Sequence, residues 1–403
     1  MFGNVIGQEN VIKLLKNDVV KKSLSNSIIF YGEHSNGKLT TAFELVRVLN
    51  CKYNGESSCQ CSNCTRIKTL DFEGFIFLSR RDFTYYLCEY INSYKQTQDQ
   101  KYIEKIRRII KLIFLPLQDF LVKECFSESD KKFIGEQSEN IQKIISKDEF
   151  NSSDLEDIQK INSNILELYK KPNIPVDSIR GMLEWTYITQ PDINRVVIID
   201  KVDLLEESSR NILLKRLEEP APNLFFILIA ENKNRIIETV RSRCRSYFFN
   251  KLKTEDVVAI LKNEFAEETI YNSVNDFLTR TNQYSQANIY PIVIKLINYV
   301  LVKEHSFFEL TTFINGFQDR KQVKAILHNL KTTIEKEMLQ RQISYDLEPE
   351  IKSLRNISNI NLNYIAKLIK DRYNKIETFN LNPILVLEGI FYPIKTMVQN
   401  DQI

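Results

Sequence analysis

The chain has 403 residues, of which 43% are hydrophobic, and this length predicts two or three domains with real cores. Its 55 basic and 52 acidic residues leave a net charge of only +3, which argues against a protein that binds nucleic acid through one large basic surface. The sequence shows neither a secretion signal nor an apolar run of the roughly 18 residues that cross a membrane, so we expect a soluble, cytoplasmic protein without a membrane partner.

Composition also bears on secondary structure and on catalysis. Ten glycines and ten prolines are few for this length, and long stretches rich in Ile, Leu, Lys and Asn favour a mostly helical chain. The three histidines, His34, His305 and His328, lie far apart in the sequence. A catalytic site built on several histidines is therefore not expected.

The N-terminal segment leads into a helix. Val5 and Ile6 precede Val11, Leu14 and Leu15, which recur at helical spacing. From these residues alone, the segment is an ordinary approach to a helix.

A strand is predicted over residues 27–31, because this short run is almost wholly apolar. It continues into the sequence GEHSNGK, which begins at Gly32 and ends at Gly37 and Lys38, and a helix is expected to follow. Strand, glycine loop and helix in this order predict a phosphate-binding loop, in which backbone N–H groups surround the phosphates and the lysine reaches the outer ones. A chance glycine turn is the alternative.

The residue after this lysine departs from the phosphate-loop pattern. The pattern requires Ser or Thr there, because the hydroxyl holds Mg²⁺, whereas this chain has Leu39. Thr40 lies one position on, about 100° around the helix, and is expected to point elsewhere. Residual nucleotide binding at the loop stays open.

Four of the seven cysteines, Cys51, Cys59, Cys61 and Cys64, follow this helix. In a chain without a secretion signal, such a cluster is more typical of a metal site than of disulfides. Four thiolates would hold a structural Zn²⁺ ion, since they leave no open position for catalysis. The tight spacing of Cys59 and Cys61 leaves open that one cysteine is a spectator, and free thiols or a disulfide are the alternatives.

Residues 79–173 are predicted to form two or three amphipathic helices, after a short strand over residues 75–78. Apolar residues repeat every three or four positions over residues 103–120 and again over residues 155–168. Pro116 should kink the first of these helices. Whether the region contacts DNA, a partner or only itself stays open, and a solvated helical hairpin is the simplest interpretation.

The central stretch, residues 195–249, predicts strand, helix, strand and helix. Its first strand, over residues 195–199, ends in Asp200, which places a carboxylate at the carboxyl end of a buried parallel strand, where open α/β sheets bind ligands. A second buried strand is predicted over residues 224–229, and the last helix should close in residues 240–245.

Beyond residue 249 the pattern is helical to the end of the chain. Apolar residues recur on helical faces. Asn382 and Pro383 have the order of an N-cap and a first helical turn, and so mark the start of the last helix. From these residues alone, any helical bundle would satisfy the pattern.

Two short motifs carry a resemblance to a known family. Residues 217–220, Leu-Glu-Glu-Pro, and residues 242–244, Ser-Arg-Cys, resemble signatures of the clamp-loader subunits of bacterial DNA polymerase III, which are AAA+ proteins. Arg241 and Arg245 on either side of the second motif favour the delta-prime branch of that family over the gamma/tau branch.

The resemblance implies an α/β AAA+ fold, a parallel sheet flanked by helices, with a small helical lid and a C-terminal helical collar. It implies a nucleotide-binding-like domain over residues 1–248, a lid over residues 249–303 and an oligomerisation collar over residues 304–403. Within the first domain it implies a zinc module at residues 51–64, whereas residues 79–173 are an insertion that does not match the family.

The resemblance also implies roles for individual residues. Val5 and Ile6 would line the adenine pocket, and Arg243 would be an arginine finger that reaches the ATP of a neighbouring subunit. A basic cluster that only neutralises a helix dipole is the alternative for Arg243. The degenerate nucleotide site of the chain itself would further comprise Gly32, Gly37, Lys38, Thr40 and Asp200.

Several departures from working members of the family affect this site. Lys201 follows Asp200 where those members have the glutamate that aligns the attacking water, and Leu39 replaces the hydroxyl that holds the metal. Ala230 stands where a polar sensor is expected, with Glu231 or Asn232 as substitutes. Phosphoryl transfer depends on positioning and on charge stabilisation, so we expect no turnover, and ATP binding by this chain is doubtful.

The sequence therefore predicts a non-hydrolysing, delta-prime-like subunit of the replicative sliding-clamp loader. The implied partners are gamma/tau and delta subunits, the sliding clamp, and primer-template DNA reached through the assembly. An ATP-hydrolysing motor of gamma/tau type, with Thr40 and another acid recruited to the metal, is the first alternative. A free-standing, zinc-stabilised DNA-binding protein is the second, and the balanced charge argues against it.

Overall fold

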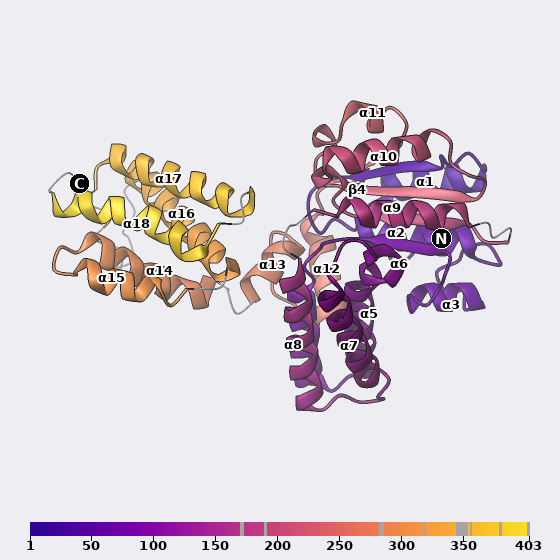
Figure 1. Cartoon of the computed structure of the whole chain (residues 1–403), viewed down its shortest axis with the longest axis horizontal. Helices are drawn as coiled ribbons and strands as arrows, with labels where there is room; N and C mark the ends of the chain where they lie inside the picture. Colours follow the sequence, from indigo (N-terminus) through magenta and orange to yellow (C-terminus); the bar gives the residue numbers. More distant parts are fainter. Residues whose placement is uncertain are drawn as a thin grey trace. The chain divides into compact units, whose positions relative to one another are not determined.

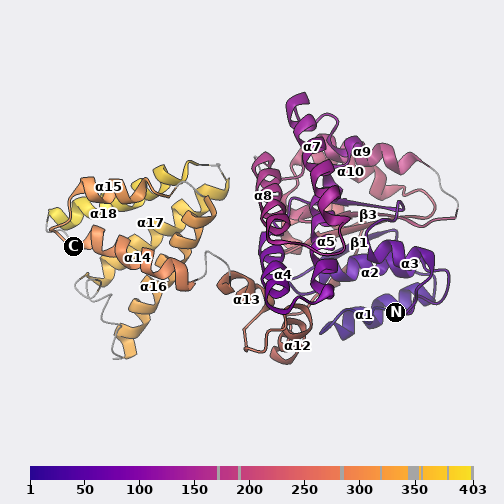
Figure 2. The same cartoon turned by 90° about the horizontal axis from the view of Figure 1, so that it is seen from below.

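The structure is a computed structural model and describes residues 1–169, 173–188, 192–281, 286–317, 320–343, 354, 357–378 and 381–400. The chain divides into two compact units, Met1–Leu278 and Thr279–Ile403, shown in Figures 1 and 2. None of the helices in the described ranges is long and apolar enough to cross a membrane.

A sheet of five parallel strands forms the centre of the first unit, in the order β2-β3-β4-β1-β5. The first four strands along the chain are those that the apolar runs predict, and the predicted class, a parallel sheet flanked by helices, is confirmed. The strands are β1 (Ser27–Tyr31), β2 (Phe75–Leu78), β3 (Arg195–Ile199), β4 (Leu224–Ala230) and β5 (Arg245–Phe248).

The fifth strand corrects the predicted helix ending in residues 240–245. The helix α11 (Glu238–Arg241) is short, and β5 begins at Arg245, which pairs with Ile28 of β1. Without β5, one edge of β1 would carry unpaired backbone groups, and backbone hydrogen bonds to β5 satisfy them. Pairing with the distant strand β1 therefore determines the conformation of these residues, although their local sequence pattern favours a helix.

Helices cover both faces of this sheet, so its strands are continuous apolar runs rather than alternating ones. Ile28 and Phe30 share a core with α1 and α2 on one face, whereas Ile29 shares a core with α9 and α10 on the other. The helices of this unit outside the insertion are α1 (Glu9–Val20), α2 (Lys38–Asn50), α3 (Ser62–Lys68), α9 (Val176–Tyr187), η2 (Val202–Leu204), α10 (Glu207–Glu218), η3 (Lys233–Arg235), α11, α12 (Thr254–Phe265) and the first part of α13 (Val274–Thr281).

The insertion contains more helices than the two or three predicted. Pro116 does not kink a long helix but lies in a 3-10 turn after α5 has ended, because proline has no N–H to continue the helix. The helices are α4 (Thr84–Thr97), α5 (Gln100–Phe114), η1 (Leu115–Leu117), α6 (Asp119–Val122), α7 (Glu128–Ile145) and α8 (Ser152–Leu168).

These helices are not a separately solvated hairpin, so that interpretation is wrong. Ile103 and Ile106 of α5 and Ile158 of α8 are at most 1% exposed, and they belong to the same apolar core as one face of the sheet. α4 packs against α5 and α8, and α7 packs against α8, as Figure 2 shows. The insertion is therefore an integral part of the first unit.

The second unit is helical throughout its described residues. Val293, Leu296 and Leu327 are among the residues that form its apolar core. Asn382 caps α18 by accepting a hydrogen bond from Ile384 N at 2.9 Å, with Pro383 in the first turn, as predicted. The helices are α14 (Gln286–Leu301), α15 (Phe307–Ile314), α16 (Arg320–Ile343), α17 (Asn359–Thr378) and α18 (Pro383–Gln399).

The predicted lid, residues 249–303, does not coincide with one compact unit, because α12 belongs to the first unit and α14 to the second. α12 is tied to the insertion through Glu264. The Tyr90 hydroxyl donates to this carboxylate at 3.1 Å, and Lys105 Nζ lies 2.9 Å from it. The helices α15–α18 cover the predicted collar region, residues 304–403.

Gly181 allows α6 of the insertion to approach α9. A Cβ at Gly181 would lie 2.1 Å from the carbonyl oxygen of Phe120, and a backbone oxygen cannot rotate away as a side chain would. Gly135 in α7 is the opposite case, because a Cβ there would meet nothing within 4 Å. Only the first glycine is required by packing.

We predict opposite effects for alanine at these two glycines. Gly181→Ala should lower the free energy of unfolding by about 1–3 kcal/mol, the usual cost of overpacking. Gly135→Ala should raise it by about 1 kcal/mol or less, because alanine is the better helix former. Chemical denaturation followed by circular dichroism measures both, and equal stabilities for the two variants would contradict the tight contact.

Candidate functional site

The phosphate-loop segment has the predicted order of strand, loop and helix. Gly32 follows β1 with a φ of 146°, and a Cβ there would lie 2.3 Å from the carbonyl oxygen of Phe249. Gly37 has a left-handed φ of 84° and is the N-cap of α2. Other residues rarely adopt these conformations, so both predicted glycines are needed for the shape of the loop.

Lys38 is buried at the start of α2, and its amine is turned back onto the loop. Its Nζ donates to the carbonyl oxygen of Gly32 at 2.6 Å and to that of Glu33. Burial, followed by the nearby charge of Arg81, lowers the pKa of Lys38 to about 8. The lysine is therefore already engaged by the protein's own carbonyl groups.

The hydroxyl that would hold a metal ion is missing from the start of α2. Leu39 packs partly buried against the apolar core, and Thr40 is exposed. Thr41 is buried, and its hydroxyl donates to the carbonyl oxygen of Gly37 at 2.8 Å. Neither threonine therefore takes over the position of the leucine.

Asp200 follows β3 at the predicted edge of the sheet and is paired with an arginine of the chain itself. Arg81, just beyond the neighbouring strand β2, donates from Nε to Oδ2 at 2.7 Å and from Nη2 to Oδ1 at 2.8 Å. The Ser79 hydroxyl donates to Oδ2 at 3.1 Å. Burial opposes ionisation of Asp200, but the charge and hydrogen bonds of Arg81 outweigh it and hold the pKa of the carboxyl below its usual range.

These residues do not fit a protein-bound Mg²⁺ ion. Magnesium requires oxygen ligands in near-octahedral geometry, yet both oxygens of Asp200 accept hydrogen bonds from Arg81 and Leu39 offers no oxygen. The next residue, Lys201, adds a second cation, and its backbone N–H donates to Asp200 Oδ1 at 3.1 Å. Leu39, Asp200 and Lys201 therefore offer no free oxygen ligand to such an ion.

The end of β4 carries an ion pair in place of the expected polar sensor. Ala230 is buried, and Glu231 pairs with His34 of the phosphate loop at 2.7 Å. Asn232 caps η3 by accepting a hydrogen bond from Asn234 N at 2.9 Å. Both substitutes considered from the sequence thus have local partners.

A cavity of about 590 Å³ gathers most of the predicted nucleotide-site residues. Its volume lies within the roughly 300–1,000 Å³ of ligand sites. Gly32 and Asp200 are not among its lining residues. From the predicted site it is lined by Val5, Ile6, Gly37, Lys38 and Thr40, and its other walls include Arg81, Tyr86, Tyr90 and Arg108 of the insertion and Ile260 of α12.

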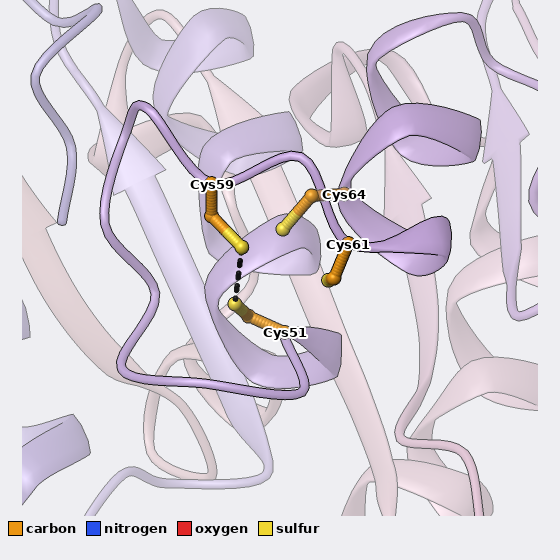
Figure 3. A group of neighbouring side chains, drawn as sticks. All are labelled: Cys51, Cys59, Cys61 and Cys64. Atoms are coloured by element: carbon orange, nitrogen blue, oxygen red, sulfur yellow. Dashed lines mark hydrogen bonds between the residues drawn. The ribbon is translucent and has the colours of Figure 1, made fainter.

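All four predicted metal ligands converge between the end of α2 and the start of α3, as Figure 3 shows. Their sulfur atoms lie within 4.8 Å of one another, and those of Cys51 and Cys59 are 3.6 Å apart. A tetrahedral zinc ion with Zn–S bonds of about 2.3 Å places its sulfurs about 3.8 Å apart. The four thiols therefore fit such an ion, and no position marks one of them as a spectator.

Arg47 of α2 holds this cysteine segment in place. Its guanidinium is buried, lies 3.6 Å from Cys64 Sγ, and donates to the carbonyl oxygens of Glu56 at 2.8 Å and Gly55 at 3.1 Å. Glu44, one turn earlier, pairs with it at 2.9 Å. Burial raises the pKa of the Cys64 thiol to about 12, and Arg47 opposes that shift. A coordinating metal ion would deprotonate the thiol outright.

Arg243 lies in the turn between α11 and β5. Its side chain is 34% exposed, and it pairs with Glu218 at 2.5 Å and donates to the carbonyl oxygen of Thr239 at 2.6 Å. Glu218 belongs to the Leu-Glu-Glu-Pro motif, so this ion pair joins the two motifs of the family resemblance. Exposed pairs contribute only about 0–1 kcal/mol, so the arginine can exchange this partner at low cost.

Sequence reasoning missed two arginines that this site depends on. Arg47 is the one cation of α2 besides Lys38, and it lies between the apolar residues Val46 and Val48, so its position was a usable signal. Arg81 offered no such signal, because its role depends on β2 lying beside β3, which the order of strands along the chain does not reveal.

Comparison with known proteins identifies relatives of this chain. The sequence model of the family described as "DNA polymerase III, delta subunit" matches residues 7–113 and 112–253. These matches cover more than half of the chain.

Three curated relatives show the range of similarity. DNA polymerase III subunit gamma of Buchnera aphidicola subsp. Baizongia pistaciae is 21% identical over 333 residues, which are 78% of this chain and 66% of that protein. Subunit gamma/tau of Mycoplasma genitalium is 22% identical over 72% of this chain and 34% of its own length. Subunit delta' of Haemophilus influenzae is 34% identical, but over 24% of this chain and 30% of its own length. The chain thus spans about a third to two thirds of the length of these relatives.

We predict that the freshly purified, reduced chain carries about one zinc ion, held by the four cysteines. Cys61→Ser should lower the zinc content and the melting temperature, because the site loses a thiolate. Cys88→Ser, which changes a cysteine outside the cluster, is the matched control and should keep the metal. Elemental analysis measures the content, and less than about half an equivalent in the unmodified chain would refute the zinc site.

Proposed function

The chain belongs to the DNA polymerase III, delta subunit family, and from this premise we propose that it is a non-hydrolysing, delta-prime-like subunit of the replicative sliding-clamp loader. Membership supplies the coarser assignment, a DNA polymerase III clamp-loader subunit. The proposal adds two roles to it. The chain's own nucleotide site does not hydrolyse ATP, and Arg243 serves the ATP site of a neighbour.

The observation that carries the first role is the pairing of both Asp200 oxygens with Arg81. Breaking a buried pair of this kind would leave an uncompensated charge, at a cost of about 3–5 kcal/mol. A metal ion would therefore have to displace the arginine before it could bind. Leu39 and Lys201 support the same proposal, because neither can hold a metal ion or align a water molecule.

The second role rests on the position of Arg243. Its side chain is partly exposed, and its ion pair with Glu218 lies at the surface, so a phosphate of a neighbouring subunit could replace the carboxylate. An arginine donated in trans raises the rate of phosphoryl transfer by about 10³–10⁵ where it has been measured. One residue of this chain could therefore control an ATP site that belongs to another subunit.

The remaining parts of the proposal rest on the family resemblance and on the cysteine cluster. The chain acts in the cytoplasm with gamma/tau and delta subunits, the sliding clamp and primer-template DNA. Residues 249–303 act as a lid and residues 304–403 as a collar that assembles with partner collars. The cysteine cluster holds a structural Zn²⁺ ion and has no catalytic part.

An ATP-hydrolysing motor of gamma/tau type is the second candidate. The names of the relatives favour it, because those that match most of this chain are named gamma or gamma/tau, whereas the delta' match covers 24% of it. Thr40 lines the cavity beside Lys38 and would have to reach the metal ion in such a motor.

We predict that Arg243→Ala leaves the assembled complex intact and lowers its DNA-stimulated ATPase. The neighbouring site should lose about 10³-fold or more in rate, since it loses the cation that stabilises the transition state. Arg241→Ala, two residues away in the same basic cluster, is the matched control and should retain turnover. Equal losses in both variants would favour the helix-dipole role instead.

The isolated chain separates the two candidate functions. We expect no ATP turnover by the purified chain with Mg²⁺, because Asp200 is unavailable to the metal. Turnover that is measurable in a steady-state phosphate-release assay and abolished by Lys38→Ala would establish the motor and refute the non-hydrolysing proposal.

A further inference from the structure

We propose that Arg81 is a built-in replacement for the divalent ion, and that the cavity beside Lys38 binds a nucleoside triphosphate free of metal. The inference rests on the proposed function, in which this site does not hydrolyse ATP. It goes further by assigning the site a ligand and a charge state. Magnesium does not fit the residues present, but a phosphate-binding cavity remains.

The geometry of Arg81 allows it to bind Asp200 and a phosphate group at the same time. Its fork to Asp200 uses Nε and Nη2, which leaves Nη1 outside the pair. The Arg81 side chain is 19% exposed, whereas the Asp200 side chain is fully buried, and Arg81 lines the cavity although Asp200 does not. Arginine is planar, always charged and able to bind carboxylate and phosphate together, so it can connect the strand carboxylate to a phosphate as a metal ion would.

The charges around the cavity favour an anion. The two glutamates that line it are neutralised, Glu44 by Arg47 and Glu264 by Lys105. Three further lining cations, Lys38, Lys68 and Arg108, donate instead to backbone carbonyl oxygens. None of these hydrogen bonds goes to a carboxylate, so a polyphosphate would bring negative charge into direct contact with the three cations, whereas a divalent cation would be repelled.

The rest of the lining favours a nucleoside over a bare polyphosphate. Val5 lies beside the phosphate loop, with its Cγ1 at 3.7 Å from the position of a Cβ on Gly37. Ile6 and Ile260 add apolar surface, and Tyr86 adds an aromatic ring. Apolar and aromatic groups with a few charged ones are typical of sites for nucleotide-sized ligands.

Calorimetric titration of the full chain with ATP tests the inference, once in EDTA and once with excess Mg²⁺. We expect binding in EDTA that is at least as tight as in Mg²⁺. Inorganic tripolyphosphate should bind more weakly than ATP, because it lacks the nucleoside. Equal affinities for ATP and tripolyphosphate would overturn the nucleoside assignment.

Variants of Arg81 test its role more directly than titration of the unmodified chain does. Arg81→Ala should weaken ATP binding in EDTA by about tenfold or more, the usual effect of losing a charged hydrogen bond, and Mg²⁺ should now restore part of it because Asp200 is free. Arg80→Ala is the matched control, since Arg80 stacks on the Tyr169 ring at 3.8 Å and does not line the cavity.

A second variant covers the case in which Arg81→Ala does not fold, because that change leaves Asp200 buried and unpaired. In Arg81→Ala/Asp200→Asn the uncompensated charge is absent. This double variant should bind ATP weakly in EDTA and in Mg²⁺ alike. ATP binding equal to that of the unmodified chain would overturn the role of Arg81.

The remaining outcomes distinguish the two proposals. No ATP binding at millimolar concentration, or binding that requires Mg²⁺ without turnover, overturns this inference and leaves the non-hydrolysing role standing. Turnover of ATP in Mg²⁺ by the isolated chain overturns the proposed function itself, and the present inference with it.

Discussion

The ion pair between Arg81 and Asp200 is the interaction on which the predicted nucleotide site depends. An ionised carboxylate that is 1% exposed needs a strong partner, either a metal ion or a cation held by the protein. Here Arg81, in the segment just beyond β2, supplies that partner, because β2 lies next to β3 in the sheet. The pair also joins the ends of these two strands, so the same contact stabilises the sheet edge and removes the carboxylate from metal binding.

The insertion changes what surrounds this edge. Its helices share the core of the sheet, and α4 and α5 both contact Glu264 of α12 through Tyr90 and Lys105. One wall of the cavity is therefore built from residues of α4 and α5. The loop with Lys38 and the apolar pair Val5 and Ile6 line the same cavity. The cavity beside this loop thus has a largely basic lining.

The cysteine cluster contacts α2, the helix that follows the phosphate loop. α2 begins at Lys38 and contains Arg47 in its last turn, where the guanidinium donates to the carbonyl oxygens of the loop that leads to Cys64. A buried arginine with Glu44 as its partner is satisfied on all sides, which makes this part of the chain rigid. A metal ion at the cluster would therefore stabilise the C-terminal end of the helix whose N-terminal end carries the loop.

The sequence by itself determined four strands, the phosphate loop and the group of four cysteines, because apolar runs and the spacing of glycines and cysteines are local signals. It did not reveal β5, since that strand exists through pairing with β1, nor the burial of the insertion helices. Arg81 and Asp200 lie 119 residues apart, and no local pattern connects them. Only the tertiary structure decided that they meet, because the order of strands in a sheet depends on packing between distant segments. The strand order places Arg81 beside Asp200, and this contact determines the chemistry of the site.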